Sequence, residues 1–284
     1  MSKVLVLGQN GQLASEFKRL LPASCSAQFI GREHLRSEAF GQLQSLVRLF
    51  KPSVVINCAA YTGVDKAEQI SERDACFSAN RDLPELIAKL SAELGFHLIH
   101  YSTDYVFDGS ANQAYSESDM TSPVNVYGLS KLQGELAVNR YAASSTIVRT
   151  SWVYSKFGHN FVKTMLRLSE AGKPIRVVDD QVGCPTWARD IAEFTFKNLM
   201  KPSGENELFH YSGAGRATWF EFAREIFAIQ NIKAEVVPIK TVEYPTPAKR
   251  PVFGVMSKAK IEHQFDIKVE NWKASLKTCL GELE

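Results

Sequence analysis

Short apolar runs alternate with longer stretches of mixed apolar and polar residues through the first half of the chain. The short runs are rich in Val, Ile and Leu and predict buried strands, whereas the longer stretches predict helices. The predicted strands are Val4–Leu7, Ala27–Ile30, Val54–Ile56, His97–His100 and Thr146–Val148. The predicted helices are Gln12–Leu21, Phe40–Phe50, Asp82–Leu94 and a helix that carries Tyr127. This alternation predicts a doubly wound α/β fold, in which helices cover both faces of a parallel sheet.

The pattern is less regular after about residue 150, where helical stretches are separated by segments rich in Pro and Gly. These stretches are 160–169, 187–199, 218–229 and 271–280. We therefore predict a larger domain over residues 1–150 and a smaller C-terminal α/β lobe over residues 151–284. The boundary between the two lobes is not expected to be a single cut in the chain. Arg176–Val178 could be a strand that returns to the first sheet, so a segment near residues 175–200 is expected to return to the larger domain.

The 284-residue chain has an ordinary soluble composition, with 45% hydrophobic residues, 23% charged residues and a formal net charge of +2. This charge provides no global basic field, so neither nucleic acid nor a membrane is the expected partner. The chain starts directly in an apolar strand, without a charged leader or an apolar run long enough to span a membrane, which predicts a cytoplasmic protein. Its five cysteines are scattered and lack CxxC spacing, so neither a disulfide framework nor a zinc site is expected.

A glycine-containing turn, Gly8–Ala14, follows the first predicted strand and opens the first predicted helix. In a dinucleotide-binding loop, Gly8 would permit the tight turn, Gly11 would let the backbone approach a pyrophosphate, and Ala14 would supply the small contact between helix and strand. The N-terminus of the helix would then face the anion with free N–H groups. The turn therefore predicts that residues 1–150 form an NAD(P)-binding Rossmann domain.

The segment after the second predicted strand bears on the choice of cofactor. At this place an acid usually bonds the ribose hydroxyls of NAD, whereas an arginine accommodates the 2′-phosphate of NADP. Here Arg32 and Arg36 flank Glu33. The two arginines favour NADPH, and Glu33, which could bond a ribose, leaves NADH as the alternative.

Tyr127 and Lys131 stand four residues apart on a predicted helix, and therefore on the same face. A phenol has a pKa of roughly 10 and is a poor acid at neutral pH, but a neighbouring cation lowers that pKa. Thr103 follows the strand His97–His100, at the carboxyl edge of the sheet where ligands bind. A solvated helix face would show the same Tyr–Lys spacing, so the interpretation depends on combining the pair with Thr103 and the turn at Gly8.

This combination resembles the Ser/Thr, Tyr and Lys set of the extended short-chain dehydrogenases. Longer runs narrow the resemblance to the dTDP-4-dehydrorhamnose reductases, which reduce a 4-keto sugar in the last step of dTDP-L-rhamnose synthesis. The runs are Asn57–Glu68, Ser102–Gly109, Arg149–Tyr154, Asp180–Thr186 and Pro245–Pro251. The resemblance spans nearly the whole chain, and its most specific parts are Tyr61–Glu68 and Ser102–Gly109.

The resemblance implies NADPH-dependent reduction of the C4 ketone of dTDP-4-dehydro-L-rhamnose to dTDP-L-rhamnose, with hydride from the nicotinamide and a proton from Tyr127. Lys131 would lower the pKa of that phenol and hold the nicotinamide ribose, and Thr103 would bond the same carbonyl. The expected cofactor-binding residues, which include the two arginines, are Gly8, Gly11, Gln12, Leu13, Arg32, Arg36, Ala59, Ala60, Tyr61, Tyr127 and Lys131. The expected substrate-binding residues are Thr103, Asp104, Tyr105, Trp152 and Arg250, and residues 151–284 are expected to form mainly a substrate-binding lobe.

Trp152 and Arg250 would bind different parts of the sugar nucleotide. Trp152 would offer an aromatic face to the sugar nucleotide. Arg250, beside Lys249, would grip the substrate diphosphate, because a guanidinium binds phosphate bidentately.

The chain departs from the family pattern at two places. Arg36 stands where the family commonly carries an acid, which supports the preference for NADPH. After Pro251 the usual continuation contains Ser, Leu and Asp, whereas this chain has Val252–Met256, so the second lobe could recognise a different sugar or nucleotide. Some family members hold magnesium between subunits, but no ligands for it are identified in this chain and no metal is predicted.

Two other functions are compatible with the sequence. One is another nucleotide-sugar reductase or epimerase of the extended short-chain family. The other is a non-catalytic NADP-binding regulatory subunit, similar to the β subunit of methionine adenosyltransferase. The intact set of Thr103, Tyr127 and Lys131 favours catalysis. The expected partner is a nucleotide-sugar substrate, and assembly into a homodimer is left open.

Overall fold

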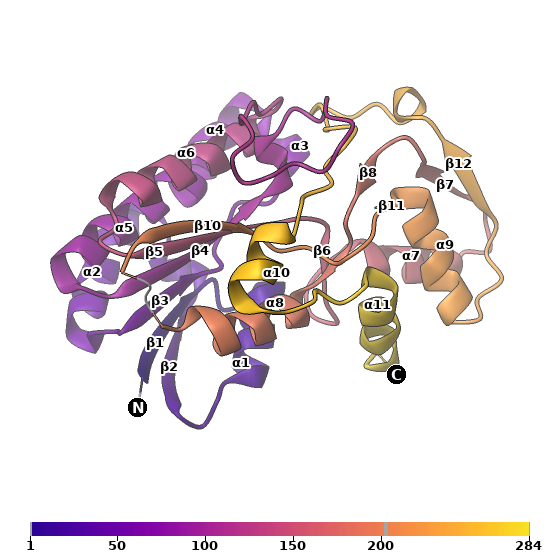
Figure 1. The fold of residues 1–284 in the computed structure, drawn as a ribbon. Helices are drawn as coiled ribbons and strands as arrows, with labels where there is room; N and C mark the ends of the chain where they lie inside the picture. Colours follow the sequence, from indigo (N-terminus) through magenta and orange to yellow (C-terminus); the bar gives the residue numbers. More distant parts are fainter. Residues whose placement is uncertain (1, 202–203, 284) are drawn as a thin grey trace.

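The protein, analysed as a computed structural model that describes residues 2–201 and 204–283, contains a six-stranded sheet with the order β10-β5-β4-β3-β1-β2 (Figure 1). Its strands are β1 (Ser2–Leu7), β2 (Cys25–Ile30), β3 (Val54–Asn57), β4 (His97–Thr103), β5 (Ser145–Thr150) and β10 (Asn206–His210). Every neighbouring pair in this sheet is parallel. The order reverses beside β1, which confirms the predicted doubly wound fold.

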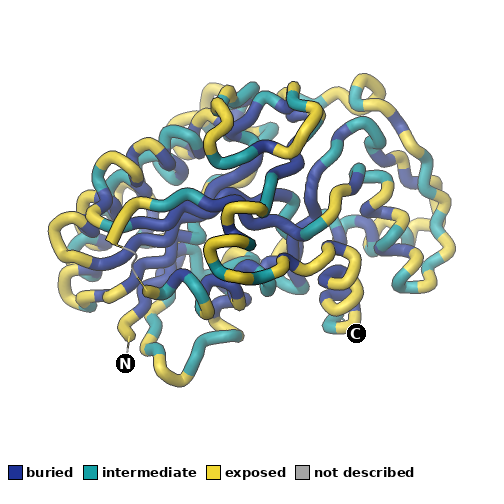
Figure 2. The backbone as a smooth tube through the Cα atoms, viewed as in Figure 1, coloured by how far each residue is buried: buried dark blue, intermediate teal, exposed yellow. Residues whose placement is uncertain are grey.

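Helices cover both faces of this sheet, as the apolar strands require. The helices of the first lobe are α1 (Gln12–Leu20), α2 (Phe40–Phe50), α3 (Val64–Ala67), α4 (Ile70–Phe77), α5 (Leu83–Leu94) and α6 (Val126–Tyr141). One core cluster joins strand residues such as Val4 to Phe17 of α1, and another joins Leu5 to Ile87 of α5 and Val138 of α6. Neighbouring residues of β1 therefore face opposite cores, and Figure 2 shows the buried sheet at the centre of this lobe.

The C-terminal part of the chain forms a smaller lobe with its own apolar core. Its helices are α7 (Phe161–Ser169), α9 (Trp219–Ile229) and α11 (Trp272–Gly281). Its strands pair as β7 (Ile175–Val178) with β12 (Val236–Ile239), β8 (Val182–Gly183) with β11 (Ala217–Thr218), and β6 (Val153–Tyr154) with β9 (Thr186–Trp187). The predicted smaller α/β lobe is confirmed.

The predicted return of Arg176–Val178 to the first sheet is wrong. These residues belong to β7, which pairs in parallel with β12 in the second lobe. Ile175 and Val177 are buried while Arg176 is exposed, the alternation of a strand covered on one face, whereas all seven residues of β4 are buried.

The chain returns to the first lobe through two later elements. Helix α8 (Ala188–Phe194) packs against α1, and β10 pairs with β5. Asn206 and Glu207 give β10 a polar start, which is why its sequence did not predict a strand. Helix α10 (Ala259–Phe265) packs beside β10. The division at residue 150 remains a prediction.

Short 3₁₀ turns lie at Arg32–His34, Ser37–Ala39, Asp104–Val106 and Thr241–Glu243, and π-helical turns lie at Ser78–Asp82 and Thr195–Leu199. Across residues 2–201 and 204–283, none of the helices has both the length and the apolar character needed to cross a membrane.

Candidate active site

The turn between β1 and α1 has the shape that an approaching pyrophosphate requires. Gly8 has φ +93, and a Cβ atom there would lie 2.9 Å from the backbone nitrogen of Ala59. Gly11 is the N-cap of the nine-residue helix α1 and no side chain caps this end. The N–H groups of the first turn therefore remain available to an anion, and the residues present fit a dinucleotide.

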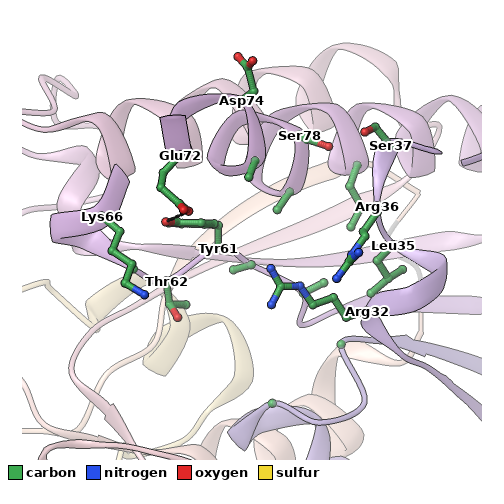
Figure 3. Close-up of a pocket in the computed structure, with 18 of the residues that line it drawn as sticks. Arg32, Leu35, Arg36, Ser37, Tyr61, Thr62, Lys66, Glu72, Asp74 and Ser78 are labelled. Atoms are coloured by element: carbon green, nitrogen blue, oxygen red, sulfur yellow. Dashed lines mark hydrogen bonds between the residues drawn. The ribbon is translucent and has the colours of Figure 1, made fainter. Parts of the chain in front are cut away.

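A cavity of about 920 Å³ opens beside this turn. The expected cofactor residues among its lining are Gly8, Gly11, Arg32, Arg36, Ala59, Ala60 and Tyr61. Figure 3 shows the side chains of Arg32 and Arg36 reaching into it from the segment after β2. Both arginines are exposed, so a phosphate there would be met by two cations in contact with solvent.

Tyr61 lines the cavity and is held in place by hydrogen bonds to Glu72 and Asn80. Its hydroxyl donates to Oε2 of Glu72 at 2.7 Å, as the dashed line in Figure 3 marks. Its backbone N–H donates to Oδ1 of Asn80 at 2.9 Å, and the Asn80 amide donates back to the Tyr61 carbonyl at 3.1 Å. Burial, followed by the bond to Glu72, raises the pKa of the Tyr61 phenol to about 12, so it stays a neutral donor.

Four expected cofactor residues lie outside the lining of this cavity: Gln12 and Leu13 on α1, and Tyr127 and Lys131 on α6. The Gln12 side chain faces the second lobe, where Nε2 donates to the Val153 carbonyl at 3.4 Å and Oε1 accepts from Asn160 at 2.9 Å. Leu13 packs against the core beneath the sheet. A contact with the pyrophosphate would therefore come from their backbone N–H groups in the first turn of α1.

The three candidate catalytic residues come from two adjacent elements. Thr103 ends β4, and Tyr127 and Lys131 lie on the first two turns of α6. The N-cap side chain of Asn125 accepts the Gly128 N–H at 2.7 Å and fixes the start of this helix. Gly128 lets α6 approach the loop after β4, because a Cβ there would lie 2.2 Å from the Tyr105 carbonyl oxygen.

Burial has the largest effect on the pKa values of both Tyr127 and Lys131, whereas the sequence suggested that the charge of Lys131 would lower the pKa of Tyr127. The Lys131 ammonium donates to the Tyr101 carbonyl at 2.6 Å. Burial lowers the pKa of Lys131 to about 8, against the opposing charge of Glu135. Burial raises the pKa of the Tyr127 phenol, and the hydrogen bond with the Thr103 hydroxyl acts in the opposite direction. Burial is the larger of these two effects, so the Tyr127 phenol keeps its proton and can act as a proton donor.

Asp104 lies in the same hydrogen-bonded group. It is buried, and the Thr103 hydroxyl donates to its Oδ1 at 3.1 Å. Burial raises the pKa of this carboxyl to about 7, against the bond from Thr103. Tyr105, the next residue, sets its ring edge-on to Tyr127 with centroids 5.6 Å apart.

Arg250 and Trp152, the other two expected substrate residues, already have partners within the protein. Arg250 forms a bidentate pair with Asp65, at 3.1 Å and 2.7 Å. The Trp152 ring stacks on Trp219 with centroids 3.5 Å apart, and its backbone takes φ +47. Trp219 covers one face of this ring, and Gly183 also lies against it, since a Cβ there would clash with Cε2 of Trp152.

Several residues that support the site were not singled out from the sequence. Glu68 accepts the Val126 N–H at 2.8 Å, and Asn125 and Asn80 hold the start of α6 and Tyr61. An asparagine directly before an apolar helix is an N-cap signal that could have identified Asn125. No residue pattern would have identified the pair of Asp65 with Arg250, which are separated by 185 positions.

No group of three or more His, Cys, Asp or Glu side chains in the part of the chain that the structure describes is arranged to hold a metal ion.

A doubly wound sheet, a glycine turn before α1 and a Thr–Tyr–Lys group at the carboxyl edge together define a short-chain dehydrogenase/reductase of the extended type. The family described as "RmlD substrate binding domain" matches residues 2–284. The chain belongs to this family, the dTDP-4-dehydrorhamnose reductases.

Individual relatives cover essentially the whole chain. The dTDP-4-dehydrorhamnose reductase of Sinorhizobium fredii is 41% identical over 99% of this chain and 97% of its own length. That of Burkholderia thailandensis is 37% identical over 99% of both chains. The crystal structure of the reductase from Bacillus anthracis in complex with NADP has 34% identity and a TM-score of 0.94, with 99% of each chain covered.

Proposed function

We propose that the protein reduces the C4 ketone of dTDP-4-dehydro-L-rhamnose to dTDP-L-rhamnose with NADPH. Its relatives from Sinorhizobium and Burkholderia are named dTDP-4-dehydrorhamnose reductases, and the Bacillus anthracis enzyme was crystallised with NADP. The convergence of Thr103, Tyr127 and Lys131 at the edge of the sheet carries the proposal, because ketone reduction needs a proton donor there.

The bound NADPH supplies the hydride. The N-terminus of α1 holds the pyrophosphate, and Arg32 and Arg36 hold the 2′-phosphate. Tyr127 gives its proton to the C4 oxygen, and Thr103 bonds the same oxygen. The Lys131 ammonium, beside the end of β4, holds the nicotinamide ribose. Asp104, Tyr105 and Trp152 hold the sugar nucleotide.

The test is to incubate the purified protein with NADPH and freshly prepared dTDP-4-dehydro-L-rhamnose and to follow cofactor absorbance. Stoichiometric oxidation with formation of dTDP-L-rhamnose is expected. Binding of NADPH without oxidation would indicate the regulatory-subunit alternative. Isomerisation of the sugar without net oxidation would indicate an epimerase. Location in the cytoplasm remains a prediction, and assembly into a homodimer is left open.

Lys131→Met is expected to weaken NADPH binding by about 10- to 100-fold, which corresponds to one hydrogen bond from a charged donor. Lys131 with its pKa of about 8 is charged below that pH and neutral above it. In the wild type, kcat/KM for NADPH is therefore expected to fall as the pH rises through about 8. The Met variant should lack this basic limb, and its remaining limb should lie at higher pH, where the phenol ionises. A pH profile identical to that of the wild type would contradict the role of Lys131.

Replacing Arg32 and Arg36 together with Ala is expected to weaken NADPH binding by about 10- to 100-fold and NADH binding by much less, since only NADPH carries the 2′-phosphate. Titration of both cofactors against intrinsic fluorescence measures the difference. Arg48→Ala is the control, because Arg48 is exposed and pairs with Glu93 on α5. Equal losses for NADPH and NADH would assign the arginines to another part of the cofactor.

A further inference from the structure

Residues 249–256, here called the crossing segment, run from the second lobe to the catalytic edge of the first (Figure 1). The Lys249 carbonyl accepts from Asn125, the N-cap of the helix that carries Tyr127, at 2.8 Å. The bidentate pair of Arg250 with Asp65 fixes the next residue. The crossing segment thus contacts α3 and the N-cap of α6, both in the first lobe.

The backbone of the crossing segment is held in place around Gly254. The Gly254 N–H donates to the Val182 carbonyl at 2.8 Å, and the Val182 N–H donates to the Val252 carbonyl at 2.8 Å. The Val255 carbonyl accepts from Tyr115 at 2.9 Å. These bonds to two other segments leave the backbone at Gly254 little room to retreat.

Gly254 lies directly against the Asp104 carboxyl. A Cβ atom at this position would be 2.6 Å from Oδ2 of Asp104, closer than real Cβ contacts. The backbone at Gly254 does not take a positive φ, so its conformation alone does not call for glycine. The need for glycine is therefore steric and comes from the carboxyl.

The position of this carboxyl determines where the Thr103 hydroxyl points. Thr103 donates to Oδ1 of Asp104 at 3.1 Å, which leaves its oxygen to accept the proton of the Tyr127 phenol. A carboxyl pushed from the side of Oδ2 would move Oδ1 and release the Thr103 hydroxyl from its present orientation.

We propose that Gly254 is a positioning residue of the reductase site: its missing side chain lets the crossing segment close on Asp104 and hold the Thr103 hydroxyl in line with Tyr127. This role rests on the proposed reduction.

Gly254→Ala is expected to lower kcat on the order of 10- to 100-fold, the size of effect that a small misplacement of a catalytic group produces. The KM and dissociation constant for NADPH are expected to stay within about twofold of the wild type, because the crossing segment does not line the cofactor cavity. Gly41→Ala is the matched control, since a Cβ there meets nothing within 4 Å and kcat should not change.

A double-mutant cycle with Asp104→Ala separates this role from a general structural one. Once the carboxyl is removed, Gly254→Ala should cause no further loss of kcat, because the atom it would displace is absent. Independent, additive losses would overturn the proposal. If Gly254→Ala alone fails to fold, the double variant should fold again, and failure of both would also overturn it. If the wild type does not oxidise NADPH in the presence of the substrate, both the proposed function and the role of Gly254 are wrong. If the wild type is active and Gly254→Ala has the same kcat, only the role of Gly254 is wrong.

Discussion

Tyr127→Phe is expected to lower kcat by about 10²- to 10⁴-fold, the usual contribution of a positioned proton donor. The variant loses the hydroxyl that would protonate the C4 oxygen and retains the ring that lies edge-on to Tyr105, 5.6 Å away. Loss of the bond to Thr103 should cost only about 1 kcal/mol of stability. Single-turnover oxidation of NADPH measures the chemical step, and fluorescence titration measures whether the variant still binds the cofactor.

Tyr244→Phe is a suitable control, because Tyr244 is 59% exposed on the second lobe. Its kcat is expected to equal that of the wild type. Wild-type turnover by Tyr127→Phe would assign proton delivery to another group, of which the Asp104 carboxyl, with its pKa near 7, is the first candidate. A large loss of NADPH affinity would instead show that the phenol acts mainly on the cofactor.

The features that the sequence predicted correctly are those with local physical causes. Gly8 could be recognised because a tight turn after an apolar strand requires φ above zero, and the structure gives it φ +93. Tyr127 and Lys131 could be placed on one face because helical spacing depends only on neighbouring residues. The continuous apolar runs of β3 and β4 predicted strands buried on both faces.

Contacts between distant segments left no such local pattern. Arg250 pairs with Asp65, which lies far away in the sequence. Gly254 lies against Asp104, which precedes it by 150 residues. Likewise, the Lys131 ammonium donates to the Tyr101 carbonyl of β4 because α6 packs on that strand. Such pairings depend on how lobes and helices meet, and one sequence alone does not specify them.

Glu135→Ala is expected to destabilise the protein by about 3–5 kcal/mol, because it leaves the Arg149 guanidinium buried without its counter-charge. The side chains of Arg149 and Glu135 are only 4% and 6% exposed, and they form two hydrogen bonds, at 2.9 Å and 2.7 Å, between β5 and α6. Urea denaturation followed by circular dichroism measures the change in free energy of unfolding. Glu85→Ala is the control, since the Lys89–Glu85 pair is solvent-exposed and should contribute less than about 1 kcal/mol.

Glu135→Ala should also change the pKa of Lys131, which lies one turn away on α6. The charge of Glu135 raises the pKa of Lys131 against the effect of burial, so its loss should move that pKa further below 8. The basic limb of kcat/KM for NADPH is then expected at lower pH than in the wild type. Replacing both partners, as Arg149→Met with Glu135→Leu, should recover much of the stability, because no charge is left buried, but should not restore the pH profile. A double variant that regained both would show that Glu135 affects Lys131 through packing alone, whereas recovery of stability without the pH profile would assign that effect to its charge.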